Sequence, residues 1–500
     1  MESSPSRGRR PGRGVNVDVH DLHDHALPCM NTQVNPSSRQ AALWDGRFGA
    51  PAADAALTLS GSLEMDLPLA EHDVAASRVH VAELERLGLV GTADAARLHE
   101  ALGDVASRLA DGSFAWRPEH EDIHMNVEAA VIAAVGPELG GMLQAGRSRN
   151  EEIVTDERRW LRQATAQLTG GVRALQATIL TRAEQEAGTI LPAHTHTQPA
   201  QPVLLAHHLL AYVEMLDRDA GRLAAAADRA DRSPAGSGAV AGSGLRLDRR
   251  SVADRLGFAG ITENSIDAVA DRDYALETIA ALAILLGHLS RFAGELVLWS
   301  TPYVGFARLD DAFSSGSSML PNKRNPDSAE LVRARAARVD GDLLAVLSLV
   351  RGLPLAYHRD LQETRRAMFD AVESAGLCLE VMNGIVDTLA FDRDRMRASA
   401  GAGHSRAVLL AERLVARGVP FREAHRRIGR LVAAAEEAGV DLASLPEGTL
   451  TEALPELHGD IRPTLEEAIA AADVHGGTAP DRVSGALATA RERLGAEITA

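Results

Sequence analysis

Residues 314–327 combine small, hydroxyl-bearing and charged side chains in a pattern that could handle a proton and a carboxylate. Four serines surround Gly316, and Lys323 and Asn325 follow before Pro326. A loop that binds a carboxylate needs positive charge close by. Lys323 and the free N–H groups of a following helix N-terminus would supply that charge. The segment therefore predicts a mobile loop with the groups needed to handle a carboxylate and a proton.

The residues after this loop predict the element that positions it. Residues 327–350 are rich in helix formers, Pro326 suits a first helical turn, and Asn325 suits the position before it. A serine-rich capping loop without chemical consequence is the alternative, and for a Ser-Gly-Ser cluster alone it would be the commoner outcome.

Other polar segments hold further candidates. In residues 146–152, Arg149 and Asn150 stand beside Gly and Ser before a helix, which is typical of an anion site or of a surface turn. Residues 191–199 contain His194 and His196, which could donate a proton, form a zinc pair or be structural. A third and fourth zinc ligand at a convincing spacing are missing from the sequence. Residues 233–244 are too rich in glycine for a helix and are a linker or a loop approaching a ligand.

The composition limits the class of protein. The chain has 500 residues, is 45% hydrophobic and has only 3% aromatic residues, which favours helices over sheet. Its formal net charge of −17 argues against nucleic acid or an anionic membrane as the main partner. Cys29 and Cys378 are far apart, which argues against a disulfide scaffold and fits a reducing cytoplasm. We find no uncharged apolar run of about 18 residues, so we expect no membrane span.

Apolar patterning predicts an all-α protein. Helices are expected at residues 69–87, 92–110, 203–229, 278–299 and 327–350, with another opening at residues 121–128. The last three long helices are apolar on several faces, so a bundle shared between subunits would bury them. We predict a disordered tail over residues 1–40, an N-terminal helical domain over 41–145, a central bundle domain over 146–396 and a small helical domain over 397–500.

The loop resembles a known signature. Residues 316–326 read Gly-Ser-Ser-Met-Leu-Pro-Asn-Lys-Arg-Asn-Pro, close to the Gly-Ser-Ser-x-Met-Pro-x-Lys-x-Asn-Pro signature of the fumarase/aspartase superfamily, with Leu320 where Met is usual. Further segments, in the same order along roughly residues 43–430, make the chain similar to the argininosuccinate lyase family. They are residues 43–48, 121–128, 146–150, 195–196, 264–267, 271–273, 310–313 and 355–363.

The resemblance implies a fold, a reaction and an assembly. The expected fold has three helical domains, and the expected assembly is a cytoplasmic homotetramer whose central helices pool into one bundle. Each active site would take loops from three subunits. The expected reaction eliminates arginine from argininosuccinate, an N-substituted aspartate, and releases fumarate in arginine biosynthesis. No metal or organic cofactor is implied.

The resemblance also implies roles for particular residues. Ser317 would be the base, His196 the second proton-transfer residue, and Glu330 the carboxylate that orients that histidine. Lys323 and Asn325 would stabilise the negative charge that develops on the substrate. The implied substrate contacts are Ser62, Arg149, Asn150, Thr195, Ser318, Tyr357, Gln362 and Arg365.

Several residues depart from the family pattern. Asn322 and Arg324 stand where Gln and Lys are usual, Thr364-Arg365 replaces Asp-Lys, Glu151-Glu152 replaces Asp-Gln, and His194 replaces Tyr. Because Arg365 stands at a family substrate contact, a paralogous lyase for another N-substituted aspartate, in specialised metabolism or aminocarboxylate breakdown, is the main alternative. An inactive crystallin-like protein is a third hypothesis, and the survival of Ser317, His196, Lys323 and Glu330 argues against it.

Overall fold

The structure is a computed structural model of one chain, and it describes residues 53–498. The predicted tail over residues 1–40, Cys29 and the family segment at residues 43–48 lie outside the described residues. The chain divides into two compact units, residues 1–60 and 61–500. In the first unit the described element is helix α1 (Asp54–Ser60).

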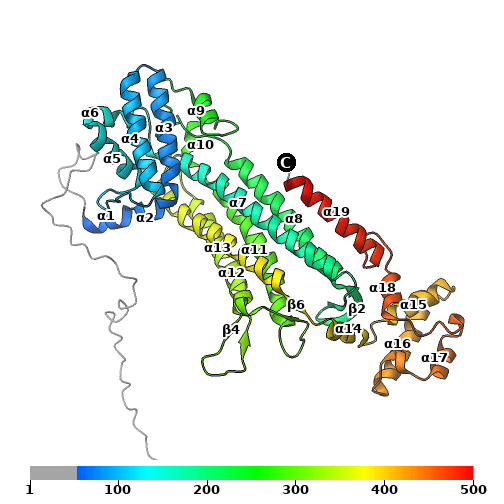
Figure 1. Cartoon of the computed structure of the whole chain (residues 1–500). Coiled ribbons are helices and arrows are strands. Elements are labelled where there is room, and N and C mark those ends of the chain that lie inside the picture. The colour runs from blue at the N-terminus through cyan, green and yellow to red at the C-terminus, as the bar shows by residue number, and fades with distance from the viewer. Residues whose placement is uncertain (1–52, 499–500) are drawn as a thin grey trace, which may run out of the picture. The chain divides into compact units, whose positions relative to one another are not determined.

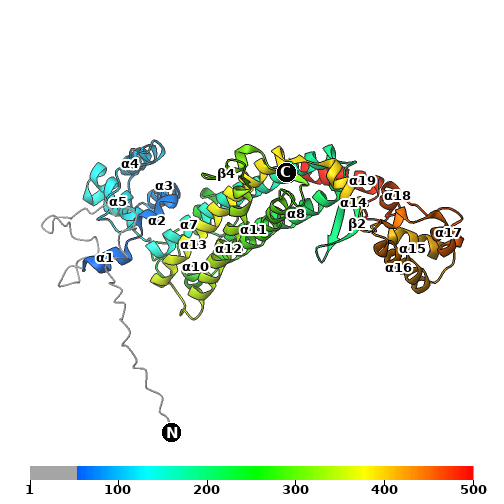
Figure 2. The ribbon, with the colours of Figure 1, turned by 90° about the horizontal axis from the view of Figure 1, so that it is seen from below.

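Five long helices form the central bundle of the second unit. They run side by side in both ribbon views (Figures 1 and 2) and are α7 (Arg149–Gln185), α8 (Leu205–Ala230), α11 (Asp273–Trp299), α12 (Asp327–Val350) and α13 (Thr364–Thr388). α11 packs against α8, α12 and α13, and one continuous apolar core runs through all five. The predicted helices at 203–229, 278–299 and 327–350 correspond to α8, α11 and α12, so the predicted all-α fold is confirmed.

The N-terminal helices have an apolar core of their own. It is built around side chains such as Val81, Leu98 and Val131. Asp122 caps helix α5 by accepting a hydrogen bond from the N–H of Met125 at 2.8 Å. The elements of this region are α2 (Leu63–Asp66), η4 (Leu67–Leu69), α3 (Ala70–Arg86), α4 (Thr92–Ala110), α5 (Ile123–Val135), α6 (Pro137–Gly140) and η5 (Gly141–Gln144).

The C-terminal region divides between two cores. Helices α15 to α17 enclose a small core that includes Leu414, Ile428 and Leu450. Helix α19 instead packs against α7 and α8, and its Leu487 belongs to the central core. The predicted domain boundaries stay predictions, since residues 61–500 form one compact unit. The elements are α14 (Arg393–Gly401), α15 (Ala407–Ala416), α16 (Phe421–Glu437), η8 (Leu442–Ser444), α17 (Glu447–Ala453), η9 (Pro455–Leu457), α18 (Leu465–Ala470) and α19 (Pro480–Ile498).

Three two-stranded antiparallel ribbons lie among the described residues. They pair β1 (Ile190–Thr195) with β2 (Gln198–Leu204), β3 (Ala307–Arg308) with β6 (Ala390–Phe391), and β4 (Ser315–Gly316) with β5 (Arg324–Asn325). The first and third hold the segments that the sequence predicted as polar loops. Short helical elements complete the second unit: α9 (Arg249–Arg255), α10 (Ser265–Ala270), η6 (Asp311–Phe313) and η7 (Arg359–Glu363).

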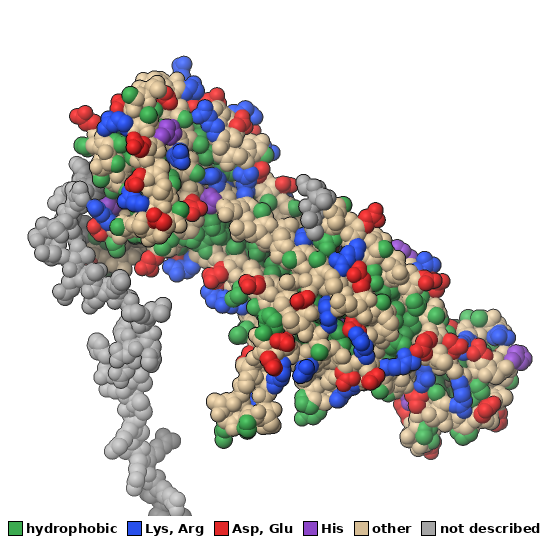
Figure 3. Space-filling view, in the orientation of Figure 1, with side chains coloured by type: hydrophobic (Ala, Val, Ile, Leu, Met, Phe, Trp, Pro, Cys, Tyr) green, Lys and Arg blue, Asp and Glu red, His purple; other side chains and the backbone are tan. Residues whose placement is uncertain are grey.

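Among the described residues, α11 is the one helix that is long and apolar enough to cross a membrane by length and composition. Leu282, Leu286 and Phe292 of α11 are fully or almost fully buried in the bundle core. Its apolar composition is therefore explained by its central position between α8, α12 and α13. On the face drawn in Figure 3, acidic and basic side chains are interspersed, without a patch of a single sign.

The core between α8 and α11 yields a stability prediction. The rings of Tyr212 and Phe292 stack with centroids 4.1 Å apart, and Phe292 is 1% exposed. Phe292→Ala should lower the free energy of unfolding by about 3–5 kcal/mol, because it leaves a cavity where a large side chain was buried. Phe421→Ala removes the same atoms from a ring that is 60% exposed on α16, and is expected to change stability much less. The free energy of unfolding is measured in urea. An equal decrease for Phe292→Ala and Phe421→Ala would contradict this packing.

Candidate active site

The hairpin β4–β5 holds the signature loop. Ser315 pairs with Asn325 across the hairpin, and the amide of Asn325 donates to the Ser315 hydroxyl at 3.3 Å. That hydroxyl in turn donates to the Asp327 carboxylate at the start of α12. Pro326, not Asn325, is the residue before the helix, and the Asn325 side chain contacts the hairpin instead. These contacts fix both ends of the loop that carries Ser317. Figure 1 shows the hairpin at the label β4.

The Ser317 hydroxyl is held by two backbone N–H groups of its own loop. The side chain is half-buried, and its Oγ accepts hydrogen bonds from the N–H groups of Met319 at 3.3 Å and Leu320 at 3.0 Å. Two N–H donors aimed at one oxygen stabilise negative charge on it. Ser318 and Lys323 are exposed on the same loop.

Arg324, a departure from the family pattern, braces the loop. Its guanidinium donates to the carbonyl oxygen of Leu309 and forms an ion pair with Asp311. A guanidinium can make both contacts at once because its donors are arranged in a planar fork. The exchange at Arg324 therefore has a structural use in this chain, whereas Asn322 is exposed and its exchange has no structural explanation.

His196 occupies the tip of the β1–β2 hairpin. Thr195 pairs with Gln198, so His196 and Thr197 form a two-residue turn with φ values of 54° and 59°. Positive φ at two non-glycine residues costs energy, and such strain is often found at functional sites. His194, Thr195 and His196 are exposed, which places them where a neighbouring molecule can reach them.

The first turn of α7 carries the predicted anion-binding residues. Arg149 is its first residue, and its Nη1 lies 3.1 Å from Asp122 Oδ2 and 3.6 Å from Glu121 Oε2. The amide of Asn150 donates to the Ala239 carbonyl oxygen at 3.3 Å. Both side chains are half-buried, and Arg149 is held in place by two carboxylates.

The glycine-rich loop over residues 233–244 is anchored to the same turn. Glu151 accepts a hydrogen bond from the N–H of Gly238 at 2.7 Å. Gly238 has a φ of +60°, and a Cβ there would lie 2.6 Å from the Gly242 carbonyl oxygen. The loop thus requires glycine because its backbone folds tightly upon itself.

Ser62 of the N-terminal region and Gln362 of η7, two of the predicted substrate contacts, lie in one region of the structure, which is called the corner below. The Ser62 hydroxyl donates to Asp66 Oδ2 at 2.5 Å, and both residues are buried. Gln362 is also buried and Tyr357 is half-buried. Arg365 is 1% exposed, and its guanidinium is paired with Asp66. In the single chain Arg365 is thus directed toward Asp66, and its predicted contact with the substrate stays a prediction.

Helix α7 separates these groups within one chain. A helix of 37 residues is about 55 Å long at about 1.5 Å per residue. Arg149 and Asn150 are at its first turn, whereas the hairpin with His196 follows its last turn. His196 and Arg149 of the same chain thus cannot touch one small substrate.

Glu330, exposed in the first turn of α12, lies 3.7 Å from Arg333.

A buried charged cluster lies beneath the start of α7. Ligand atoms of Asp73, His124 and Glu152 all lie within 4.8 Å of one another and could hold a cation. Burial alone would lower the pKa of His124, but the neighbouring carboxylates, Asp73 first, raise it to about 10. His124 therefore carries a proton and donates to Asp73 at 3.0 Å. Arg147 lies 3.1 Å from Glu152, so two cations already occupy this cluster.

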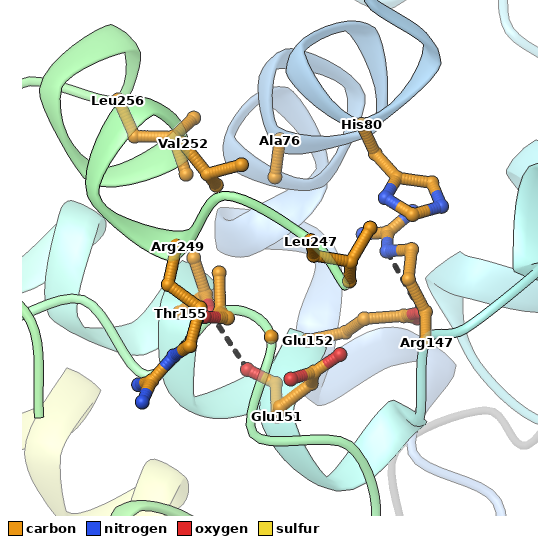
Figure 4. A pocket seen from close by; sticks show the side chains of 12 residues that line it. Ala76, His80, Arg147, Glu151, Glu152, Thr155, Leu247, Arg249, Val252 and Leu256 are labelled. Carbon is orange, nitrogen blue, oxygen red and sulfur yellow. Dashed lines mark hydrogen bonds and ion pairs between the residues drawn. The ribbon is translucent and has the colours of Figure 1, made fainter. Parts of the chain in front are cut away.

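The cluster continues into a small cavity, shown in Figure 4. The cavity measures about 30 Å³, and its lining includes His80, Arg147, Glu151 and Glu152. A space of this size is large enough to admit water. Burial raises the pKa of the Glu151 carboxyl to about 7, although the Gly238 N–H and Arg147 act in the opposite direction.

Comparison with known proteins decides the family. The family described as "Lyase" matches residues 46–341, and "Argininosuccinate lyase C-terminal" matches residues 404–471. Argininosuccinate lyase of Symbiobacterium thermophilum is 45% identical over 454 residues, which cover 90% of this chain and 98% of the relative. The chain belongs to the argininosuccinate lyase family. It is a carbon–nitrogen lyase of that type, as the sequence resemblance predicted.

Other relatives agree with this family. The argininosuccinate lyase of Hyphomonas neptunium is 44% identical over 460 residues, which cover 91% of this chain and 98% of the relative. The crystal structure of EDDS lyase in complex with formate is similar with a TM-score of 0.77 and 27% identity, covering 90% of this chain and 92% of that one. The individual site roles inferred from the argininosuccinate lyase family stay predictions for this chain.

Sequence reasoning missed three carboxylates that organise these sites. Asp66 stands four residues after Ser62, a spacing that brings both to one face of a helical turn and could have been recognised. Asp327 follows the loop directly and could have been recognised as a partner for its serines. Glu157 contacts residues more than one hundred positions away, Tyr274 and Arg365, and only the tertiary fold brings them together.

The raised pKa of Glu151 predicts a pH dependence of stability. The pKa rises from 4.5 in the exposed carboxyl to about 7 in the folded protein, so folding favours the protonated form. The stabilisation is complete below about pH 4.5 and is lost as the pH rises through about 7. In Glu151→Gln the side-chain oxygen can still accept the hydrogen bond from the Gly238 N–H. The substitution should therefore remove the fall in unfolding free energy at high pH, which is worth about 3 kcal/mol.

The measurement is urea unfolding at pH 5 and pH 8. The difference in stability between Glu151→Gln and the unmodified protein should be larger at pH 8. Glu437→Gln, at an exposed position on α16, serves as the control and should give parallel profiles. If the stability of Glu151→Gln changed with pH in parallel with that of the unmodified protein, ionisation of Glu151 would not destabilise the fold, and the prediction would be wrong.

Proposed function

We propose that the protein cleaves argininosuccinate into fumarate and arginine, as a cytoplasmic homotetramer in arginine biosynthesis. The observation that carries this proposal is the 45% identity with an argininosuccinate lyase over 90% of the chain, combined with Ser317 held in a loop with two N–H donors on its Oγ.

The reaction is an elimination with two proton transfers. A base removes a proton from the carbon next to a carboxylate, the electron pair forms the C=C bond of fumarate, and the C–N bond breaks. The released nitrogen takes up a proton. The difficult step is the first one, since the proton is weakly acidic and negative charge accumulates on the neighbouring carboxylate.

The proposed roles follow the chemistry of the side chains. Ser317 removes the proton, and Lys323 with Asn325 stabilises the negative charge. His196 protonates the leaving nitrogen, and Glu330 holds the charge and orientation of that imidazole. Substrate contacts are Ser62, Arg149, Asn150, Thr195, Ser318, Tyr357 and Gln362, with Arg365 supporting them. No cofactor enters these steps.

The proposed tetramer is supported by exposed apolar side chains on the central bundle. Leu331, Leu344 and Leu347 of α12 are 64%, 66% and 49% exposed in the single chain, and Leu298 of α11 is 53% exposed. Apolar residues gathered on long helices favour burial against another copy of the chain. The separation of Arg149 from His196 by α7 supports the same arrangement, because only different subunits can bring them to one substrate.

A second candidate is a different N-substituted aspartate as substrate. The observation in its favour is the pairing of Arg365 with Asp66, both buried, at the corner expected to contact the amine half. EDDS lyase, which has the same fold at 27% identity, is named for a substrate other than argininosuccinate. The reacting groups are common to both candidates, which therefore differ in the amine alone.

The proposal is tested with purified protein, fumarate and a panel of amines that includes arginine, with products followed by mass spectrometry, and with argininosuccinate in the forward direction. Argininosuccinate should be cleaved, and the arginine adduct should form. Ser317→Ala should reduce elimination by about 10³-fold or more while leaving the assembly intact, because the base acts only in the transition state.

The matched control is Ser113→Ala, an exposed serine in the loop after α4, and its activity should equal that of the unmodified protein. Activity of Ser317→Ala within a few-fold of the unmodified protein would exclude Ser317 as the base. An adduct with a different amine, in place of arginine, would favour the second candidate.

A further inference from the structure

One buried guanidinium joins three segments that are distant in the sequence. Arg365, near the start of α13, pairs with Asp66 at the end of α2. Its Nε donates to the Gln362 carbonyl oxygen at 3.3 Å and lies 3.6 Å from Glu157 of α7. Because Arg365 is 1% exposed, these contacts are shielded from water and strongly constrain the segments they connect.

The same contacts determine the direction of the Ser62 hydroxyl. Asp66 uses one carboxylate oxygen for Arg365 and the other for Ser62. The backbone N–H of Ser62 donates to the Glu121 carbonyl oxygen at 2.9 Å, so the residue is held from two sides. Removal of Arg365 would leave Asp66 free to turn toward another donor, and Ser62 would lose its orientation.

The charges around Arg365 are balanced within the protein. Arg365 and Arg272 face Asp66 and Glu157, and Arg272 Nε lies 3.4 Å from Glu157 Oε2. All four side chains are almost completely buried. Breaking one pair would leave a buried carboxylate without its cation, which is strongly unfavourable. The two guanidinium groups thus neutralise the two carboxylates before any substrate binds, which is the property of a support, while Glu157 Oε1 and Arg272 Nε and Nη2 have no hydrogen-bond partner among the described residues.

We infer that Arg365 is a positioning residue, which orients Ser62 through Asp66 and fixes the η7 segment with Gln362, so that both present hydrogen-bonding groups to the amine half of the substrate. This inference rests on the proposed function, and it replaces direct contact by Arg365 with action through its neighbours. The proton-transferring groups Ser317 and His196 lie on other elements. The effect of Arg365 should therefore fall on amine binding and spare the fumarate half.

The reverse reaction separates the two halves, because fumarate and the amine are then independent substrates with their own KM values. Arg365→Met should raise the KM of the amine about 10-fold or more, with the KM of fumarate changed less than about 2-fold. Asp66→Asn, which breaks the same pair from the other side, should give the same pattern. Arg365→Lys keeps the charge but loses the planar fork of the guanidinium. Its amine KM should lie between that of the unmodified protein and that of Arg365→Met.

Arg366→Met is the matched control. The Arg366 side chain is 75% exposed and lies 3.8 Å from Glu363, so the same substitution one residue further should leave both KM values unchanged. A second readout is rescue of Arg365→Ala by added guanidinium ion, which fits the space left beside Asp66. The amine KM should return toward the value of the unmodified protein, whereas ammonium ion should rescue it less.

The outcomes separate the inference from the proposed function. An unmodified protein that joins fumarate to no amine in the panel overturns the proposed function, and the inference with it. If the unmodified protein is active, an unchanged amine KM in Arg365→Met or an equal rise of both KM values overturns the inference alone. Should Arg365→Met fail to fold, Asp66→Asn and Arg365→Lys are judged by the same two criteria.

Discussion

The length of one helix constrains the whole active site. α7 spans 37 residues, about 55 Å, and it carries Arg149 at one end while the His196 hairpin follows the other. A substrate the size of an aspartate derivative cannot reach both in one chain. The rigid bundle around α7 therefore keeps the two groups apart. If both act on one substrate, as we propose, catalysis requires several chains to assemble.

The second constraint is the cost of burying charge at the start of α7. Arg365 with Asp66, and Arg147 with Glu152, bring charged groups into the protein interior in pairs, because an unpaired buried charge is too costly. The first pair connects α13 with α2, and the second joins the segment before α7 to the first turn of that helix. The same ion pairs that hold the fold together thus also orient the residues proposed to contact the substrate.

The sequence predicted much of the fold because its information is local. The helix predicted over residues 327–350 matches α12, and apolar periodicity located α8 and α11 to within a few residues. Two loops proved to be hairpins, since pairing such as Ser315 with Asn325 depends on residues across the turn. The resemblance implied a substrate contact for Arg365 but not its buried pairing with Asp66, 299 positions away. Contacts at such separations leave no periodic pattern, so only the folded structure reveals them.

The most direct test of a site shared between subunits uses two inactive variants, His196→Asn and Ser317→Ala, refolded together and shown to form mixed assemblies. If each site takes His196 and Ser317 from different chains, roughly a quarter of the sites in an equal random mixture receive neither lesion. Activity should then return to about that fraction of the unmodified protein. Mixed assemblies that stay as inactive as the separate variants would show that one chain supplies both residues, and would contradict the account.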